Sequence, residues 1–92
     1  MPYITQSDRD LLDDHISNIV VVLKKQAHWT VGGMLNYVIT KITFSLWNNY
    51  RNYYMGNTIV GALKCASSEF IHRKLNPYEE EKIKENGNVY PF

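Results

Sequence analysis

Apolar residues recur along the chain at intervals of three and four, the spacing of one face of an α-helix. The first such stripe consists of Leu12, Ile16, Ile19, Val20 and Leu23. Before it, Ser7 can accept a hydrogen bond from the Asp10 amide, and after it Lys24 and Lys25 favour a helix end. The β-branched run of residues 19–22 could equally form a short strand. Because the cap and both charged ends agree, we expect a helix that begins at Ser7.

A second helix is expected after residues 26–33, where the pattern breaks and Gly32 and Gly33 supply backbone freedom. Its apolar face consists of Leu35, Val38, Ile39, Ile42 and Leu46. The helix is predicted to end at about Asn49. Residues 47–56 then combine four aromatic side chains with three Asn before a glycine. The start of this segment is predicted to be helical and its end a turn.

The last third of the chain predicts two more helices. Asn57 or Thr58 can cap a third helix, whose stripe is Ile59, Leu63, Ala66 and Phe70. It is expected to end near Leu75, because Pro77 disfavours helical dihedrals at Asn76. Asn76 and Pro77 also form a start signal for a short fourth helix that ends at residues 86–87 with a glycine in a left-handed conformation. Residues 88–92 are predicted to be an extended tail that needs a docking surface.

The length of the chain sets the scale of the fold. Ninety-two residues without a linker or a repeat predict one helical domain over residues 1–92. A chain of this size buries only about 60 to 65% of the surface that its unfolded form exposes, so a lone monomer is marginally stable. We therefore expect an all-α, compact bundle of about four helices with an extended C-terminal tail, assembled as a homo-oligomer.

Charge and composition exclude several classes of function. Ten Lys and Arg against nine Asp and Glu leave a formal charge of +1, which disfavours binding to polymeric nucleic acid. The longest apolar run, residues 19–23, is far too short to span a membrane, and the polar first residues do not resemble a signal peptide. The expected location is the cytosol.

Metal and cofactor sites are not predicted. One Cys and three scattered His exclude an intramolecular disulfide and the usual zinc frameworks. Glu69 and His72 match half of a helical di-iron pattern, but the second half and the further carboxylates are missing. The acidic residues 79–81 fit better as charges at a helix N-terminus.

Catalysis is not predicted either, although His15 and His28 invite an acid–base interpretation. Neither histidine has a plausible nucleophile or second base at helical spacing. Cys65 lies among small apolar residues and is interpreted as a small core residue. A small nucleotide hydrolase that uses His15, His28 or Glu79 is kept as a weaker alternative to a non-enzymatic protein.

Two groups of side chains could bind a ligand. Arg73, with Lys64, His72 and Lys74, forms a local basic cluster suited to phosphate or carboxylate, but Arg73 could equally pair with Glu69 one turn earlier. The second group is aromatic and could stack on a base, or could pack in a core or a subunit interface: Trp29, Trp47, Tyr50, Tyr53 and Tyr54. Nearby amides could read base edges and ribose hydroxyls: Asn36, Asn48, Asn49, Asn52 and Asn57.

Several motifs stand out along the chain: the opening MPYI, the segment LNYVIT at residues 35–40 and the run IVGALKCA at residues 59–66, with Glu69, Phe70, Arg73, residues 77–79 and residues 85–90. Together they resemble a small family without assigned activity that is encoded in bacteriophages, prophages and bacteria. The likeness covers nearly the whole chain and departs from the family pattern at residues 25–33 and 48–57. By analogy of size and genome context, it implies a phage protein that works by binding.

The predicted function is sequestration of a nucleotide-derived immune signal, such as a cyclic nucleotide or an ADP-ribose derivative, which counteracts bacterial anti-phage defence. Cations would neutralise phosphates, rings would stack on the base, and Asn36 and Tyr37 would contact ribose or base edges. The expected ligand-binding residues are Trp29, Asn36, Tyr37, Trp47, Tyr50, Tyr53, Tyr54, Lys64, Arg73, Tyr78 and Lys82. The alternative is a protein-interaction module that blocks or bridges a host or phage protein through the aromatic segment and the tail.

Overall fold

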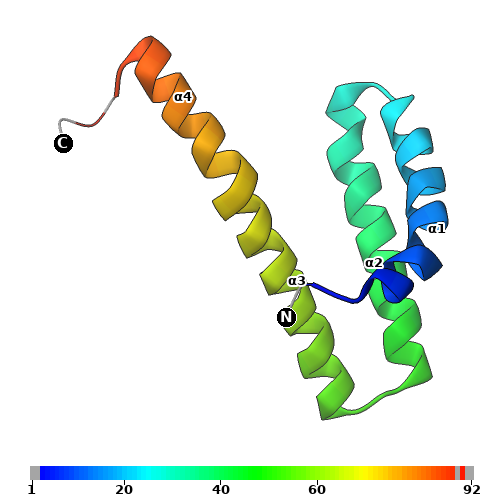
Figure 1. The fold of residues 1–92 in the computed structure, drawn as a ribbon. Helices are drawn as coiled ribbons and strands as arrows, with labels where there is room; N and C mark the ends of the chain where they lie inside the picture. The colour runs from blue at the N-terminus through cyan, green and yellow to red at the C-terminus, as the bar shows by residue number, and fades with distance from the viewer. Residues whose placement is uncertain (1–2, 89, 91–92) are drawn as a thin grey trace. The chain divides into compact units, whose positions relative to one another are not determined.

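The computed structural model describes residues 3–88 and residue 90, and all regular structure in that part of the chain is helical. This confirms the all-α class. The chain divides into two compact units, residues 3–59 and the residues from 60 onward. The elements, shown in Figure 1, are α1 (Gln6–Lys24), the 3₁₀ turn η1 (His28–Thr30), α2 (Val31–Asn49), α3 (Tyr53–Phe70), the π-helical turn η2 (Ile71–Leu75) and α4 (Asn76–Asn86).

Helix α1 begins earlier than the sequence indicated. Thr5 has the extended backbone of a capping residue, and its hydroxyl accepts a hydrogen bond from the Asp8 amide at 3.3 Å. The prediction that Ser7 caps the helix is therefore wrong, because Ser7 already lies in the first turn of α1. The predicted helix end is confirmed, since α1 ends at Lys24 and Lys25 occupies the C-cap position.

Helix α2 also begins earlier than predicted. The break after α1 is formed by η1, where the Thr30 amide and hydroxyl both donate to the Ala27 carbonyl, at 2.9 and 2.7 Å. Gly32 and Gly33 do not precede α2 but lie in its first turn. The predicted end at Asn49 is confirmed. Helices α1 and α2 run side by side in opposite directions as a helical hairpin (Figure 1).

Helix α3 begins four residues before the first predicted cap. The side-chain oxygen of Asn52 accepts a hydrogen bond from the Met55 amide at 2.8 Å, and the Asn52 carbonyl accepts one from Gly56 at 3.0 Å. Asn52 is thus the residue that caps the helix. The prediction of a cap at Asn57 or Thr58 is wrong, and residues 53–56 belong to the helix and not to a turn.

The break expected before Pro77 is a wider helical turn. Asn76 keeps helical dihedrals and its amide donates to the Ile71 carbonyl, five residues earlier, so η2 joins α3 to α4 without interruption (Figure 1). A proline in a regular α-helix clashes with the carbonyl four residues before it, here that of Arg73. A π-helical turn at this point widens the helix ahead of the ring. The prediction of a separate fourth helix capped by Asn76 is therefore wrong: α4 continues α3.

The predicted stop of the last helix is confirmed. Gly87 has a positive φ of 86°, and its amide donates to the Ile83 carbonyl at 2.8 Å. Of the predicted extended tail, residues 89, 91 and 92 lie outside the described residues.

None of the described residues is buried. The apolar stripes predicted from the sequence are present as helix faces, but most of their large side chains are at least one-third exposed. Leu23, Met34 and Val38, where α1 faces α2, are among the half-buried residues. A buried core of the kind that the stripes predict is thus not seen among the described residues of the single chain.

Candidate functional site

The polar groove, as we call it, lies on the second unit at the end of α3. Its lining is Leu63, Lys64, Ser67, Ser68, Ile71 and His72, with a cavity volume of about 440 Å³. These residues follow one another at helical intervals, so they belong to one face of α3 and the start of η2. One ammonium group, two hydroxyls and one imidazole therefore share a single hollow.

Arg73 makes the ion pair that the sequence left open. Its Nε donates to Oε2 of Glu69 at 2.9 Å, one turn earlier, and the arginine side chain is 65% exposed. Arg73 follows His72 directly but does not line the polar groove. Of the two interpretations, pairing with Glu69 is the one seen in the structure.

A second hollow on the same unit contains Lys82. Its Nζ lies 5.6 Å from the centre of the Tyr78 ring and donates to Oε2 of Glu85 at 3.0 Å. The hollow has a volume of about 350 Å³ and is lined by Glu79, Lys82, Ile83, Asn86, Gly87, Asn88 and Tyr90. Lys82 and Tyr78 are therefore neighbours, as a shared ligand-binding site would require. The Lys82 ammonium group, however, already contacts the Tyr78 ring and the Glu85 carboxylate.

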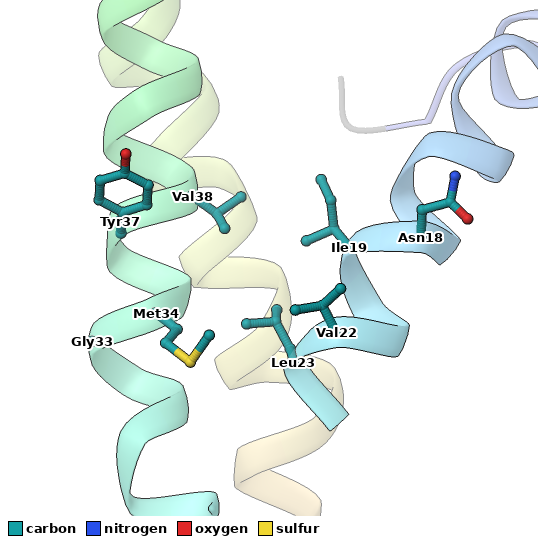
Figure 2. A pocket seen from close by; sticks show the side chains of 8 residues that line it. All are labelled: Asn18, Ile19, Val22, Leu23, Gly33, Met34, Tyr37 and Val38. Atoms are coloured by element: carbon teal, nitrogen blue, oxygen red, sulfur yellow. The ribbon is translucent and has the colours of Figure 1, made fainter. Parts of the chain in front are cut away.

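The largest of the three hollows lies between α1 and α2 in the first unit. Figure 2 shows Ile19, Val22 and Leu23 of α1 opposite Met34 and Val38 of α2. The cavity volume is about 590 Å³, and the lining is completed by Asn18, Gly33 and Tyr37. Its lining contains no charged residue, so it offers nothing that would bind a phosphate. Of the predicted ligand-binding residues, this hollow contains only Tyr37.

The two tryptophans occupy different surroundings. Trp29 is 79% exposed and contacts His28 edge to face, with ring centres 5.3 Å apart. For Trp47, a Cβ atom at Gly56 would lie 3.5 Å from its Cζ3, so the indole rests against the backbone of α3. Trp47 therefore packs against the start of α3 and remains 38% exposed.

The other predicted residues of the first unit lie on the surface. Tyr50, Tyr53 and Tyr54 are all exposed, Tyr53 to 92%. The side-chain oxygen of Asn36 accepts a hydrogen bond from the Thr40 hydroxyl at 3.3 Å.

The predicted ligand-binding residues are thus divided between the two units. Tyr37, Lys64 and Lys82 each line a different hollow. Sequence reasoning overlooked Ser67 and Ser68, although their spacing of three and four from Lys64 on a predicted helix could have identified them.

Two further properties concern metals and membranes. In the described part of the chain, no cluster of three or more His, Cys, Asp and Glu side chains is placed to hold a metal ion. Among the same residues, no helix combines the length and the apolar composition that a membrane crossing needs.

Comparison with known proteins gives one match. No curated protein matches the chain. No solved structure matches it either. One family model matches residues 1–89, and it is described as a domain of unknown function (DUF6899). Because this match covers nearly all of the 92 residues, the chain belongs to the DUF6899 family.

Proposed function

We propose that this protein is a non-enzymatic binding protein of phage type that sequesters a nucleotide-derived immune signal in the cytosol of a bacterial host. The signal would be a cyclic nucleotide or an ADP-ribose derivative, and its removal would counteract anti-phage defence. In this proposal the protein acts as a homo-oligomer and leaves the ligand chemically unchanged.

The observation that carries the proposal is the polar groove. Lys64 supplies a compact positive charge, and His72 and the two serine hydroxyls supply hydrogen-bond donors within one hollow. Such groups suit the oxygens of a phosphate, which accept several hydrogen bonds at once. Arg73 lies next to His72 in the chain, and its fork would bind a phosphate in place of the Glu69 carboxylate.

The base would be held by aromatic rings, because every base offers a face on which a ring can stack. Trp29, Tyr53 and Tyr54 present most of their surface to solvent, which is the state that a stacking residue needs before it binds.

The first test is a binding measurement on the purified full chain with cyclic dinucleotides and cyclic ADP-ribose isomers. A ligand present at a hundred times its Kd stabilises the folded state by about 2.7 kcal/mol, which raises the Tm of a chain of this size by roughly 10–20 °C. We expect such a shift with at least one of these compounds, and recovery of the intact compound after denaturation. No shift with any of them would contradict the proposal, and a converted product would favour the hydrolase.

A charge-matched pair of variants locates the site. Lys64→Gln removes the ammonium group of the polar groove and is expected to weaken binding by tenfold or more, the value of a charged hydrogen bond of about 1.5 kcal/mol or more. Lys84→Gln makes the same change on α4, outside the two hollows described for this unit, and should leave the affinity unchanged. Equal losses in both variants would indicate a general charge effect and not a site.

The second candidate is a protein-interaction module, favoured by the exposed Tyr50, Tyr53 and Tyr54. Rings that are exposed together are typical of interface anchors. In this case a chain lacking residues 88–92, or the double variant Tyr53→Ser/Tyr54→Ser, would lose a specific host or phage partner and keep its helical signal. Retained capture by both variants would contradict this second function.

A further inference from the structure

The α1–α2 hairpin leaves most of the apolar stripe of each helix exposed. Figure 2 shows Ile19, Val22 and Leu23 of α1 facing Met34 and Val38 of α2 across the hollow between the helices. The other apolar residues of these stripes are Leu12, Ile16 and Val20 on α1 and Leu35, Ile39, Ile42 and Leu46 on α2. All seven are exposed large hydrophobic residues. We call these seven residues the common face.

The two halves of the common face lie on the same side of the hairpin. With 3.6 residues per turn, Ile16 and Val20 lie clockwise of Ile19 and Val22 when α1 is viewed along its axis from Gln6. Viewed in the same way from Val31, the uncovered residues of α2 lie clockwise of those that face the hollow. Because the helices run in opposite directions, a clockwise displacement on each helix places its uncovered residues on the same side of the hairpin. The hairpin therefore presents a continuous apolar surface.

The area of this surface is comparable with what a stable dimer needs. The seven side chains are about half exposed, and a fully exposed Leu or Ile offers about 200 Å², so they present roughly 600 Å² per copy. Two copies would together bury roughly 1,200 Å² of apolar surface, the lower limit for specific interfaces before rim residues are counted. Two such hairpins packed face to face would form a four-helix bundle with a shared core.

The charges at the rim of the common face select one orientation. The acidic residues of α1 lie between residues 8 and 14, and Lys24 and Lys25 follow at its other end. Asp13 and Lys24 lie beside the stripe of Ile16 and Val20, whereas Asp14 and Lys25 lie on the opposite side of the helix. Two α1 helices related by a twofold axis and running antiparallel would bring each Asp13 close to the Lys24 of the other copy.

We propose that the common face is the interface with a second copy of this chain, paired about a twofold axis with α1 antiparallel to α1. The inference rests on the self-association in the proposed function and assigns it to a defined surface. In this register Asp13 lies beside Lys24 of the second copy. Along the helix axis, Ile16 is offset by only one residue from Val20 of the second copy. The pairing is isologous, so every contact occurs twice.

The first experiment compares Ile16→Glu with Val21→Glu by sedimentation equilibrium of the full chain without ligand. The two residues are equally exposed, 51% and 50%, but Val21 lies on the side of α1 away from the common face. We expect wild type and Val21→Glu to have twice the mass of the chain or an even multiple of it. We expect Ile16→Glu to have half the mass of wild type, with its helical circular dichroism retained. A monomeric wild type, or an oligomer that Ile16→Glu leaves intact, would overturn the inference.

The second experiment tests the register through charge and covers the case in which Ile16→Glu does not fold. Asp13→Lys and Lys24→Asp, each alone, place like charges together and should weaken association at least tenfold. The double variant Asp13→Lys/Lys24→Asp restores opposite charges and should recover most of the loss. The matched control Asp14→Lys makes the same charge change on the other side of α1 and should have no effect. No recovery in the double variant would overturn the antiparallel register.

Both association experiments are made without ligand. Their results therefore test the interface separately from the proposed sequestration. A wild-type monomer that binds a cyclic dinucleotide would overturn the interface and leave the ligand site standing. A dimer that responds to the substitutions as expected but binds none of the nucleotides would support the interface and contradict the sequestration.

Discussion

The start of α3 provides a sharp test of the fold, because sequence and structure disagree about it. In the structure Asn52 caps the helix through its 2.8 Å hydrogen bond from the Met55 amide. Replacing an N-cap Asn by Ala costs about 1 kcal/mol, within a range of roughly 0.5 to 2. Asn57, the cap expected from the sequence, lies inside α3, where Ala is the better helix former by up to about 0.7 kcal/mol. The substitutions Asn52→Ala and Asn57→Ala should therefore change stability in opposite directions.

Thermal unfolding followed by circular dichroism measures both effects. For a chain of this size, 1 kcal/mol corresponds to roughly 4–8 °C in Tm, so Asn52→Ala should lower Tm by about that amount. Asn57→Ala should leave Tm unchanged or raise it slightly. The control Asn52→Asp keeps an oxygen acceptor and adds a charge that the helix dipole favours, so it should retain the wild-type Tm. Protein concentration must be constant, because self-association makes Tm concentration-dependent.

One pattern of results would refute this reasoning. If Asn57→Ala lowered Tm by several degrees while Asn52→Ala had no effect, α3 would begin near residue 57. Tyr53 and Tyr54 would then lie in a turn, as their sequence context first indicated, and the contact between Trp47 and the α3 backbone at Gly56 would not form.

Two further predictions concern glycine conformation and the Arg73 ion pair. Gly87→Ala should cost about 1 kcal/mol by denaturant unfolding, because Gly87 has a φ of +86°. Gly61→Ala, inside α3 with nothing within 4 Å of the added Cβ, should instead stabilise by about 0.5 to 1 kcal/mol. If the two substitutions changed stability with the same sign, one of these two assignments would be contradicted. Glu69→Gln should change stability by less than about 0.5 kcal/mol, because its pair with Arg73 is exposed. If Arg73 binds phosphate, the same variant should tighten ligand binding in calorimetry, and weaker binding would oppose that role.

The helices could be predicted from the sequence, but several of their ends could not. The apolar periodicity depends only on which side of a helix is apolar, and it correctly placed helices over the regions of α1, α2 and α3. A cap depends instead on the backbone of one residue, and cap-forming residues are common near each start. Thr5 and Ser7 both qualify at α1, as Asn52 and Asn57 do at α3, and the chosen one has its side-chain oxygen within reach of an amide.

Pro77 shows a different limit of sequence reasoning. The rule that a proline ends the preceding helix assumes a regular α-helix, in which its ring meets the carbonyl four residues earlier. The chain removes this conflict by widening the turn at residues 71–75, so the helix continues. Polar residues at positions 64, 67, 68 and 72 can be placed on one face from spacing alone, because they share one helix. The hollow between α1 and α2 could not be predicted in this way, since it requires contacts between two helices.

The width of an apolar stripe indicates how many neighbours a helix needs, but not whether they come from the same chain. The stripe of α1 extends from Val22 through Ile19 to Val20, nearly half of the helix circumference. One antiparallel neighbour covers little of this stripe: Leu23 is half-buried, whereas Val22 and Ile16 are both about half exposed. Sequence periodicity therefore predicts a core, and the hairpin supplies only part of it. The remaining apolar edge requires a further layer of helices, and a second copy of the hairpin offers a complementary surface of the same length with charges that match in the antiparallel direction.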